Sequence, residues 1–90
     1  MINILRSQKG GYDKSETFTK LEEYSMLLIQ IQKGLSKDEA FDKMKEIKAK
    51  PLSRVKEGFF SKQGFSVEDT DNYISELENQ IIDALSNGDM

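Results

Sequence analysis

Apolar residues recur along two stretches of the chain at alternating steps of three and four residues. The first seam consists of Thr17, Leu21, Tyr24, Leu28 and Ile31. The second consists of Val67, Thr70, Ile74, Leu77, Ile81 and Ala84. This spacing is that of the a and d positions of a coiled coil or a short helical bundle, where one side of each helix is apolar. Between the seams lies a narrower apolar stripe, which consists of Ala40, Phe41, Met44 and Ile47.

Helix-start signals precede all three stretches. Asp13, Ser36 and Ser66 each stand three residues before a carboxylate. In this capping-box arrangement the cap and the carboxylate satisfy helix-start amides reciprocally. The negative charge also favours the positive end of the helix dipole.

Helix-end signals are equally local. Gly34 is suited to a left-handed residue after the first helix, and Pro51 disfavours helical geometry at Lys50. We therefore predict helices over residues 14–33, 37–48 and 67–86. Between the last two we expect a helical turn over 53–58 and then a loop through 61–64.

The two seams superpose when the chain is shifted by 53 residues. The glycine, aromatic and cap residues at 11–13 then fall on those at 64–66. Any two capped amphipathic helices can be aligned, but the shared glycine–aromatic pair favours a duplication. We predict one helical domain over residues 1–90, in which repeats 11–31 and 64–84 are bridged by the helix over 37–48.

The predicted fold class is all-α, a short helical bundle with heptad-type first and third helices. The seams can meet between two chains, as in a homodimer, or inside one compact, pseudo-symmetric chain. In either case the residues expected to carry this association are Leu21, Leu28, Ile74, Leu77 and Ile81.

The amino-acid composition limits the catalytic and metal-binding sites that this chain can form. The 90 residues include no cysteine and no histidine, so a thiol nucleophile, a disulfide framework and the commonest general base are missing. The acidic run at 68–72 does not fit a calcium loop, because the sixth residue from Asp69 is Ile74 and the twelfth is Gln80. We expect no catalytic residue, no metal site and no cofactor.

The chain has neither a run of ~18 apolar residues, as a membrane span needs, nor a recognisable signal peptide. We therefore expect a cytoplasmic protein.

Charge is distributed unevenly along the chain. All 13 lysines and arginines lie between Arg6 and Lys62, whereas residues 63–90 hold 7 acids and no base. Opposite charge blocks occur at interaction surfaces, and they also occur as solvated faces of one fold. The basic segment at 43–62 suggests one alternative function, a small regulatory helical protein that binds nucleic acid or an anionic membrane surface.

The glycine, aromatic, cap and acid pattern resembles the DivIVA/GpsB family of bacterial cell-division and polarity proteins. The resemblance is carried by FFSKQGFSVEDTDNYI at residues 59–74 and by GGYDKSETF at residues 10–18. It implies a non-catalytic scaffold or adaptor that forms parallel dimers at the cytoplasmic face of the membrane. It also implies protein partners in cell division or envelope organisation.

The resemblance further implies a partner-binding site. In the peptide-binding members, a tyrosine and two aspartates one helical turn apart line a groove for arginine-bearing partners. Phe65 and Asp71 match the first two positions, and Ser75 stands in place of the second acid. Tyr12 is the equivalent aromatic residue of the first copy, where Phe18 replaces the acid. We therefore expect an arginine-containing peptide to bind near Phe65 and Asp71, in the second copy alone.

Overall fold

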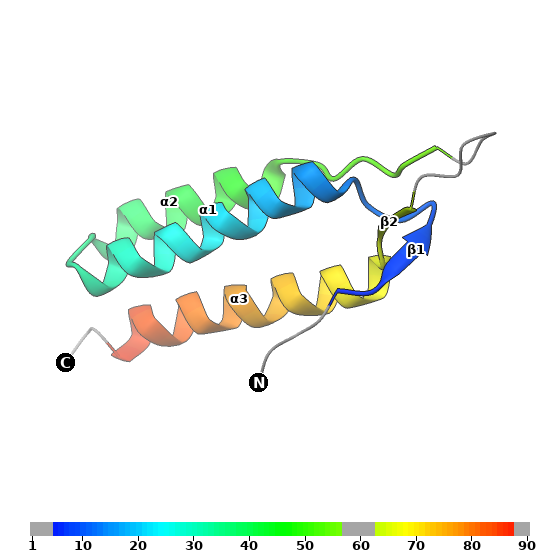
Figure 1. Ribbon diagram of the computed structural model, residues 1–90. Helices are drawn as coiled ribbons and strands as arrows, with labels where there is room; N and C mark the ends of the chain where they lie inside the picture. Colours follow the sequence, from blue (N-terminus) through cyan, green and yellow to red (C-terminus); the bar gives the residue numbers. More distant parts are fainter. Residues whose placement is uncertain (1–4, 57–62, 88–90) are drawn as a thin grey trace.

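The computed structural model describes residues 5–56 and 63–87, most of which lie in three helices (Figure 1). These helices are α1 (Lys14–Gln32), α2 (Lys37–Ala49) and α3 (Val67–Asn87). Two short strands, β1 (Ser7–Lys9) and β2 (Gln63–Phe65), form an antiparallel sheet. α1 and α3 both begin beside this sheet and run in the same direction, while α2 returns antiparallel to α1 (Figure 1).

The helix bounds follow the local sequence signals closely. The side chains of Asp13 and Ser36 accept the amides of residues 16 and 39, as expected for caps. Ser66 Oγ accepts the amide of Asp69 at 3.2 Å and starts α3 in the same way. Gly34 has a φ of 107°, the left-handed conformation that suits glycine after a helix. Each predicted helix end lies within one residue of the observed one.

The prediction of an all-α fold is wrong in one respect, because it leaves out the sheet. Gln63 and Gly64, expected in a loop, belong to β2. The helical turn expected over 53–58 is also wrong for residues 53–56, which are not helical and include an isolated bridge between Arg54 and Tyr12. The rest of that turn and the start of the expected loop lie outside the described residues.

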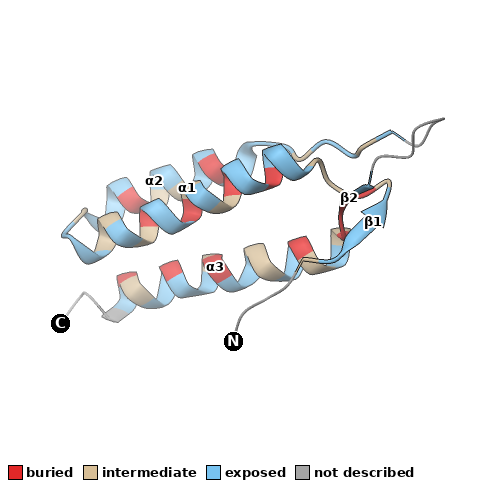
Figure 2. Cartoon of the chain, viewed as in Figure 1, coloured by how far each residue is buried: buried red, intermediate tan, exposed pale blue. Residues whose placement is uncertain are grey.

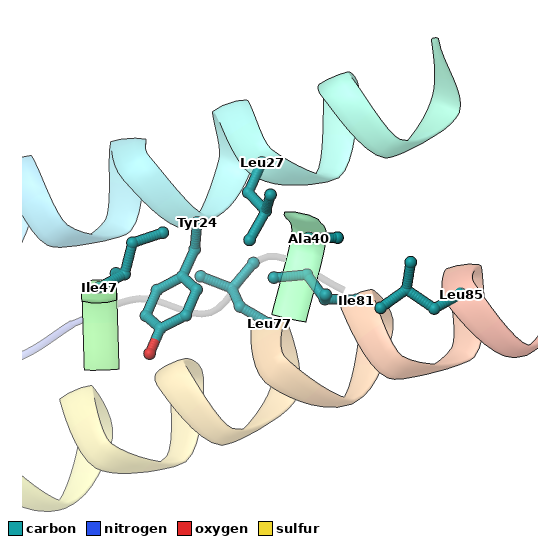
Figure 3. Packing of buried hydrophobic residues seen from close by; sticks show 7 residues of the cluster. All are labelled: Tyr24, Leu27, Ala40, Ile47, Leu77, Ile81 and Leu85. Carbon is teal, nitrogen blue, oxygen red and sulfur yellow. The ribbon is translucent and has the colours of Figure 1, made fainter. Parts of the chain in front are cut away.

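The hydrophobic core lies where the three helices meet. Tyr24 and Leu27 come from α1, Ala40 and Ile47 from α2, and Leu77, Ile81 and Leu85 from α3 (Figure 3). Figure 2 shows that the buried residues of α3 follow the side that faces α1.

The residues expected to associate meet within one chain. Leu77 and Ile81 are buried in the core, and Leu21, Leu28 and Ile74 are half-buried against it. The two seams therefore pack against each other, and α2 packs against α1. Pairing between two chains stays a prediction.

Each helix-start motif, at residues 11–13 and 64–66, is preceded by a short lead-in segment. Each lead-in segment bonds the other motif and not the one that follows it, an arrangement that we call the crossing. Residues 6–8 precede the motif at 11–13 but pair with the other motif, since Ser7 lies opposite Phe65 and the amide of Ser66 donates to Arg6 O. Residues 53–55 precede the motif at 64–66 but bond the first one. There the amide of Asp13 donates to Ser53 O at 2.8 Å. The two motifs are thus held together by each other's lead-in segments.

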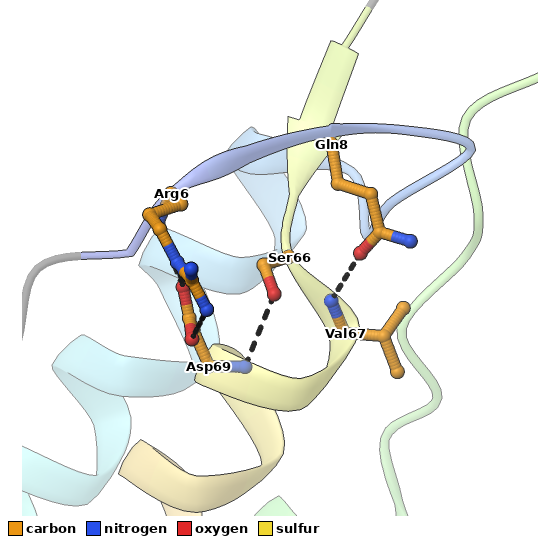
Figure 4. Close-up of polar contacts among 5 residues, drawn as sticks. All are labelled: Arg6, Gln8, Ser66, Val67 and Asp69. Carbon is orange, nitrogen blue, oxygen red and sulfur yellow. Dashed lines mark hydrogen bonds and ion pairs between the residues drawn. The ribbon is translucent and has the colours of Figure 1, made fainter.

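The acidic residues in the first turns of α1 and α3 also bond the lead-in segments. The carboxylate of Asp69 accepts both the backbone amide and the guanidinium of Arg6 (Figure 4). Glu16 Oε1 accepts the amide of Ser53 at 2.7 Å in the equivalent place. The capping box predicts that these acids bond the amide of their own cap residue. Instead they bond the neighbouring lead-in segment, while the amides of the cap residues Asp13 and Ser66 donate to its carbonyls.

Within the described residues, no helix combines the length and the apolar character needed to cross a membrane.

Candidate partner-binding site

Tyr12 and Asp71 meet at the start of the parallel helix pair. The hydroxyl of Tyr12 donates to Asp71 Oδ1 at 2.9 Å. Burial, together with this hydrogen bond to Asp71, raises the pKa of Tyr12 above its ordinary value. The phenol therefore stays a neutral donor, and the carboxylate beside it is exposed.

Phe65 lies elsewhere, against α1. Its ring packs edge-on against Phe18 with centroids 5.4 Å apart, and the Lys14 ammonium lies 5.2 Å from its centroid. The expected site pairs Phe65 with Asp71, whereas the structure pairs Asp71 with Tyr12. Each aromatic residue contacts the helix of the other motif because the motifs cross over.

A pocket of about 450 Å³ opens beside the Tyr12–Asp71 pair. Its walls come from α1, from α3 and from residues 48–52. Ile74, Ser75 and Glu78 follow Asp71 along the same side of α3 and line this pocket. Two tyrosines, two carboxylates, an aliphatic side chain and three lysines therefore share one concave surface.

A second tyrosine–carboxylate pair lies deeper in this pocket. Tyr24 is fully buried, and its hydroxyl donates to Glu78 Oε2 at 2.8 Å. Burial, followed by the bond to Glu78, strongly raises the pKa of Tyr24. The pair satisfies a phenol that the seam would otherwise leave unpaired in the core.

Lys20 closes the pocket towards α2. Its ammonium donates to Lys50 O at 2.7 Å and to Lys48 O at 3.3 Å, where the last carbonyls of α2 lack partners within the helix. Burial lowers the pKa of Lys20. Lys50 in turn pairs with Glu23 at 2.6 Å, so two of the lysines around the pocket already have acceptors.

Three bases of the segment at 43–62 are engaged inside the chain. Besides Lys50, Lys43 donates to Gln30 and Arg54 donates to the carbonyl of Gly10. The Lys43 contact joins α2 to α1, and the Arg54 contact joins residues 53–55 to the turn before α1. The structure therefore adds no specific support to nucleic acid or an anionic membrane as the ligand.

In the part of the chain that the structure describes, no group of three or more potential ligands is placed to hold a metal ion. Asp69, from the acidic run at 68–72, is paired with Arg6 at 2.8 Å. This contact lowers the pKa of Asp69 to about 2 and raises that of Arg6.

The sequence motif does not assign Lys20, Tyr24 or Glu78 to the pocket, nor the lining residues at 48 and 50–52. A signal existed for Tyr24, because a tyrosine in a buried seam needs a hydrogen-bond acceptor. No local signal existed for Lys20, whose acceptors lie 28 and 30 residues away.

Comparisons with protein-family models, with curated proteins and with solved structures found no match to this chain. A function therefore has to be inferred from its own residues and their geometry.

Proposed function

We propose that this chain is a non-catalytic, DivIVA-like adaptor that binds an arginine-bearing segment of a protein partner, in bacterial cell division or envelope organisation. The observation that carries the proposal is the Tyr12–Asp71 pair at the mouth of an open pocket. The sequence motif that precedes both α1 and α3 supports the class of protein.

A guanidinium matches the chemistry of this pocket. Asp71 is an exposed carboxylate that offers charge-assisted hydrogen bonds, and Tyr12 supplies an aromatic surface next to it. Glu78 adds a second negative charge two helical turns further along α3. The family motif does not predict an acid at this position. The aliphatic stem of an arginine could lie along Ile74 between these charges.

The pocket is held rigidly, as a binding platform needs to be. Tyr12 and Phe65 exchange two backbone hydrogen bonds of 2.9 Å, which join the two motifs directly. Lys20 fixes residues 48–50 against α1 on the opposite wall. Preorganised walls lower the ordering cost of binding.

The test is titration with a short arginine-containing peptide, followed by NMR and by fluorescence anisotropy. Replacing Asp71 by Asn should weaken binding about tenfold or more, because a hydrogen bond to a charged group contributes roughly 1.5–3 kcal/mol. Asp83→Asn, which removes an exposed acid further along α3, is the matched control. A lysine or citrulline version of the peptide tests whether the guanidinium itself is recognised.

An unchanged affinity in Asp71→Asn would contradict the proposal, as would chemical-shift changes that avoid Tyr12 and Ser75. In that case the resemblance to the family would be one of fold alone.

A further inference from the structure

The pocket beside Tyr12 is lined by both signs of charge. α3 supplies two acids, and the opposite walls supply three bases, namely Lys20, Lys48 and Lys50. The ammonium of Lys50 is paired with Glu23 at 2.6 Å, which leaves Lys20 and Lys48 as the bases available alongside the two acids. A ligand that matches this pocket therefore carries a negative group as well as a positive one.

Lys20 is a buried base with room for one more acceptor. The residue is 8% exposed, and its ammonium donates to Lys50 O at 2.7 Å and to Lys48 O at 3.3 Å. A lysine ammonium has three N–H donors, and the hydrogen bonds of the described residues use two of these. Because Lys20 lines the pocket, the third donor is available to a ligand, and a carboxylate is its strongest acceptor.

Lys48 adds a second ammonium on the same wall. Its carbonyl accepts the Lys20 ammonium, so the two residues lie side by side at the edge of the pocket. The Lys48 side chain is exposed, and within the described part of the chain its ammonium has no hydrogen bond or ion pair. A flexible four-carbon stem lets this ammonium adjust to a ligand. One carboxylate in the pocket can therefore reach both lysines.

The acids of α3 act on the same space as these lysines. Burial lowers the pKa of Lys20, and nearby carboxylates, including Glu78 and Asp71, oppose that shift. A guanidinium bound to Asp71 without a counter-charge would add a third positive group beside Lys20 and Lys48, and like charges at short range repel each other. A guanidinium that arrives together with a carboxylate is neutral overall and pairs with both walls.

We propose that the pocket recognises a dipolar segment of its partner, in which a carboxylate lies next to the arginine. This inference rests on the proposed arginine-binding function and adds the second half of the recognised motif. Asp71 binds the guanidinium, and Lys20 and Lys48 bind the carboxylate. An acidic side chain and a C-terminal carboxylate share this chemistry, so the experiment includes a peptide pair for each source.

Two pairs of short peptides serve as probes, with fluorescence anisotropy as the measurement. The first pair is end-capped and differs in one central dipeptide, arginine–aspartate against arginine–asparagine. The second pair ends in arginine, with a free carboxylate in one peptide and an amide in the other. We expect the carboxylate form to bind about tenfold more tightly in at least one pair, because it accepts charge-assisted hydrogen bonds that the amide form cannot match. The pair that shows the gain identifies the source of the carboxylate.

Variants of the chain assign the two halves of the motif. Lys48→Gln should reduce the preference for the carboxylate form to about threefold or less, since one of its two positive partners is removed. Lys45→Gln removes an exposed lysine of α2 that lies outside the pocket, and it should leave the preference unchanged. Asp71→Asn should weaken both peptides of a pair, because it removes the partner of the guanidinium. Lys20→Gln is the second test of the carboxylate site, in chains shown to melt like the parent.

Two results would overturn the inference and leave the proposed function standing. One is equal affinity within both peptide pairs, and the other is a preference for the carboxylate form that neither Lys48→Gln nor Lys20→Gln reduces. Failure of all four peptides to bind, or an affinity that Asp71→Asn leaves unchanged, would contradict the proposed function itself, and this inference with it.

Discussion

At the scale of single residues, two glycines allow the crossing at the centre of the molecule. A Cβ at Gly11 would lie 2.2 Å from Phe65 O, and a Cβ at Gly64 would lie 2.2 Å from Tyr12 O. These carbonyls accept the amides of Tyr12 and Phe65, so a side chain at either glycine forces apart the bonds that join the motifs. The glycines are needed for close approach of two backbones, and neither has a positive φ.

Gly64→Ala should therefore destabilise the fold by about 2 kcal/mol or more, because the obstructing atom is backbone and cannot rotate away. Chemical denaturation followed by circular dichroism measures the change. Ser25→Ala, on the exposed surface of α1, is the control and should change the free energy of unfolding by less than about 0.5 kcal/mol. If Gly64→Ala left the free energy of unfolding unchanged, the two motifs could move apart without loss of stability.

The Arg6–Asp69 pair predicts a dependence of stability on pH. The pKa of Asp69 falls from an ordinary value of 3.8 to about 2 in the folded chain. A carboxyl whose pKa is lower in the folded state stabilises the fold when both states are ionised, and this contribution is lost as the acid is protonated. The free energy of unfolding should thus fall as the pH drops from about 4 to about 2.

Urea unfolding across this pH range checks the prediction. Asp69→Asn should show a shallower slope than the parent chain, because the variant has no carboxyl to protonate at that place. Asp42→Asn removes an exposed aspartate of α2 instead and serves as the control. Equal slopes for Asp69→Asn and the parent would assign the acid sensitivity to other carboxyls.

At the scale of elements, the helices could be predicted from the sequence and the sheet could not. Caps, seams and helix ends depend on residues within a few positions of one another, as with Asp13 and the amide of Glu16. The sheet pairs Ser7 with Phe65, and its strands have only three residues each. Such short strands show no alternation that periodicity could detect, and their partner is set by the packing of α1 on α3.

The seam of α3 predicts a sharp contrast between neighbouring positions. Ile81 is fully buried among the three helices, whereas Ile82 is 42% exposed. Ile81→Ala should cost about 2–5 kcal/mol, the range for truncating a buried aliphatic side chain, and Ile82→Ala should cost less than about 1 kcal/mol. Thermal or urea denaturation of the two variants gives the comparison. A similarly small loss of stability in both variants would mean that the seam of α3 lies in solvent.

At the scale of the whole molecule, the crossing explains why the binding site was only partly predictable. The sequence predicts a site at Phe65 and Asp71 and identifies Tyr12 only as the equivalent aromatic residue of the other copy, whereas the structure pairs Tyr12 with Asp71. The 53-residue shift aligns Tyr12 with Phe65, and it carries no information on which helix each aromatic residue contacts. Which helix each aromatic residue contacts depends on the lead-in segments, whose backbone hydrogen bonds join residues 40 or more positions apart.

The same arrangement predicts how the chain unfolds. Since α1 and α3 bury their seams against each other within one chain, no second chain is needed to complete the core. The melting temperature should then stay constant, within about 1–2 °C, over a hundredfold range of protein concentration, whereas a core shared between chains would make it rise with concentration. Light scattering on the same samples gives the mass. A melting temperature that rises steadily, together with the mass of two chains, would mean that the seams also hold a dimer together.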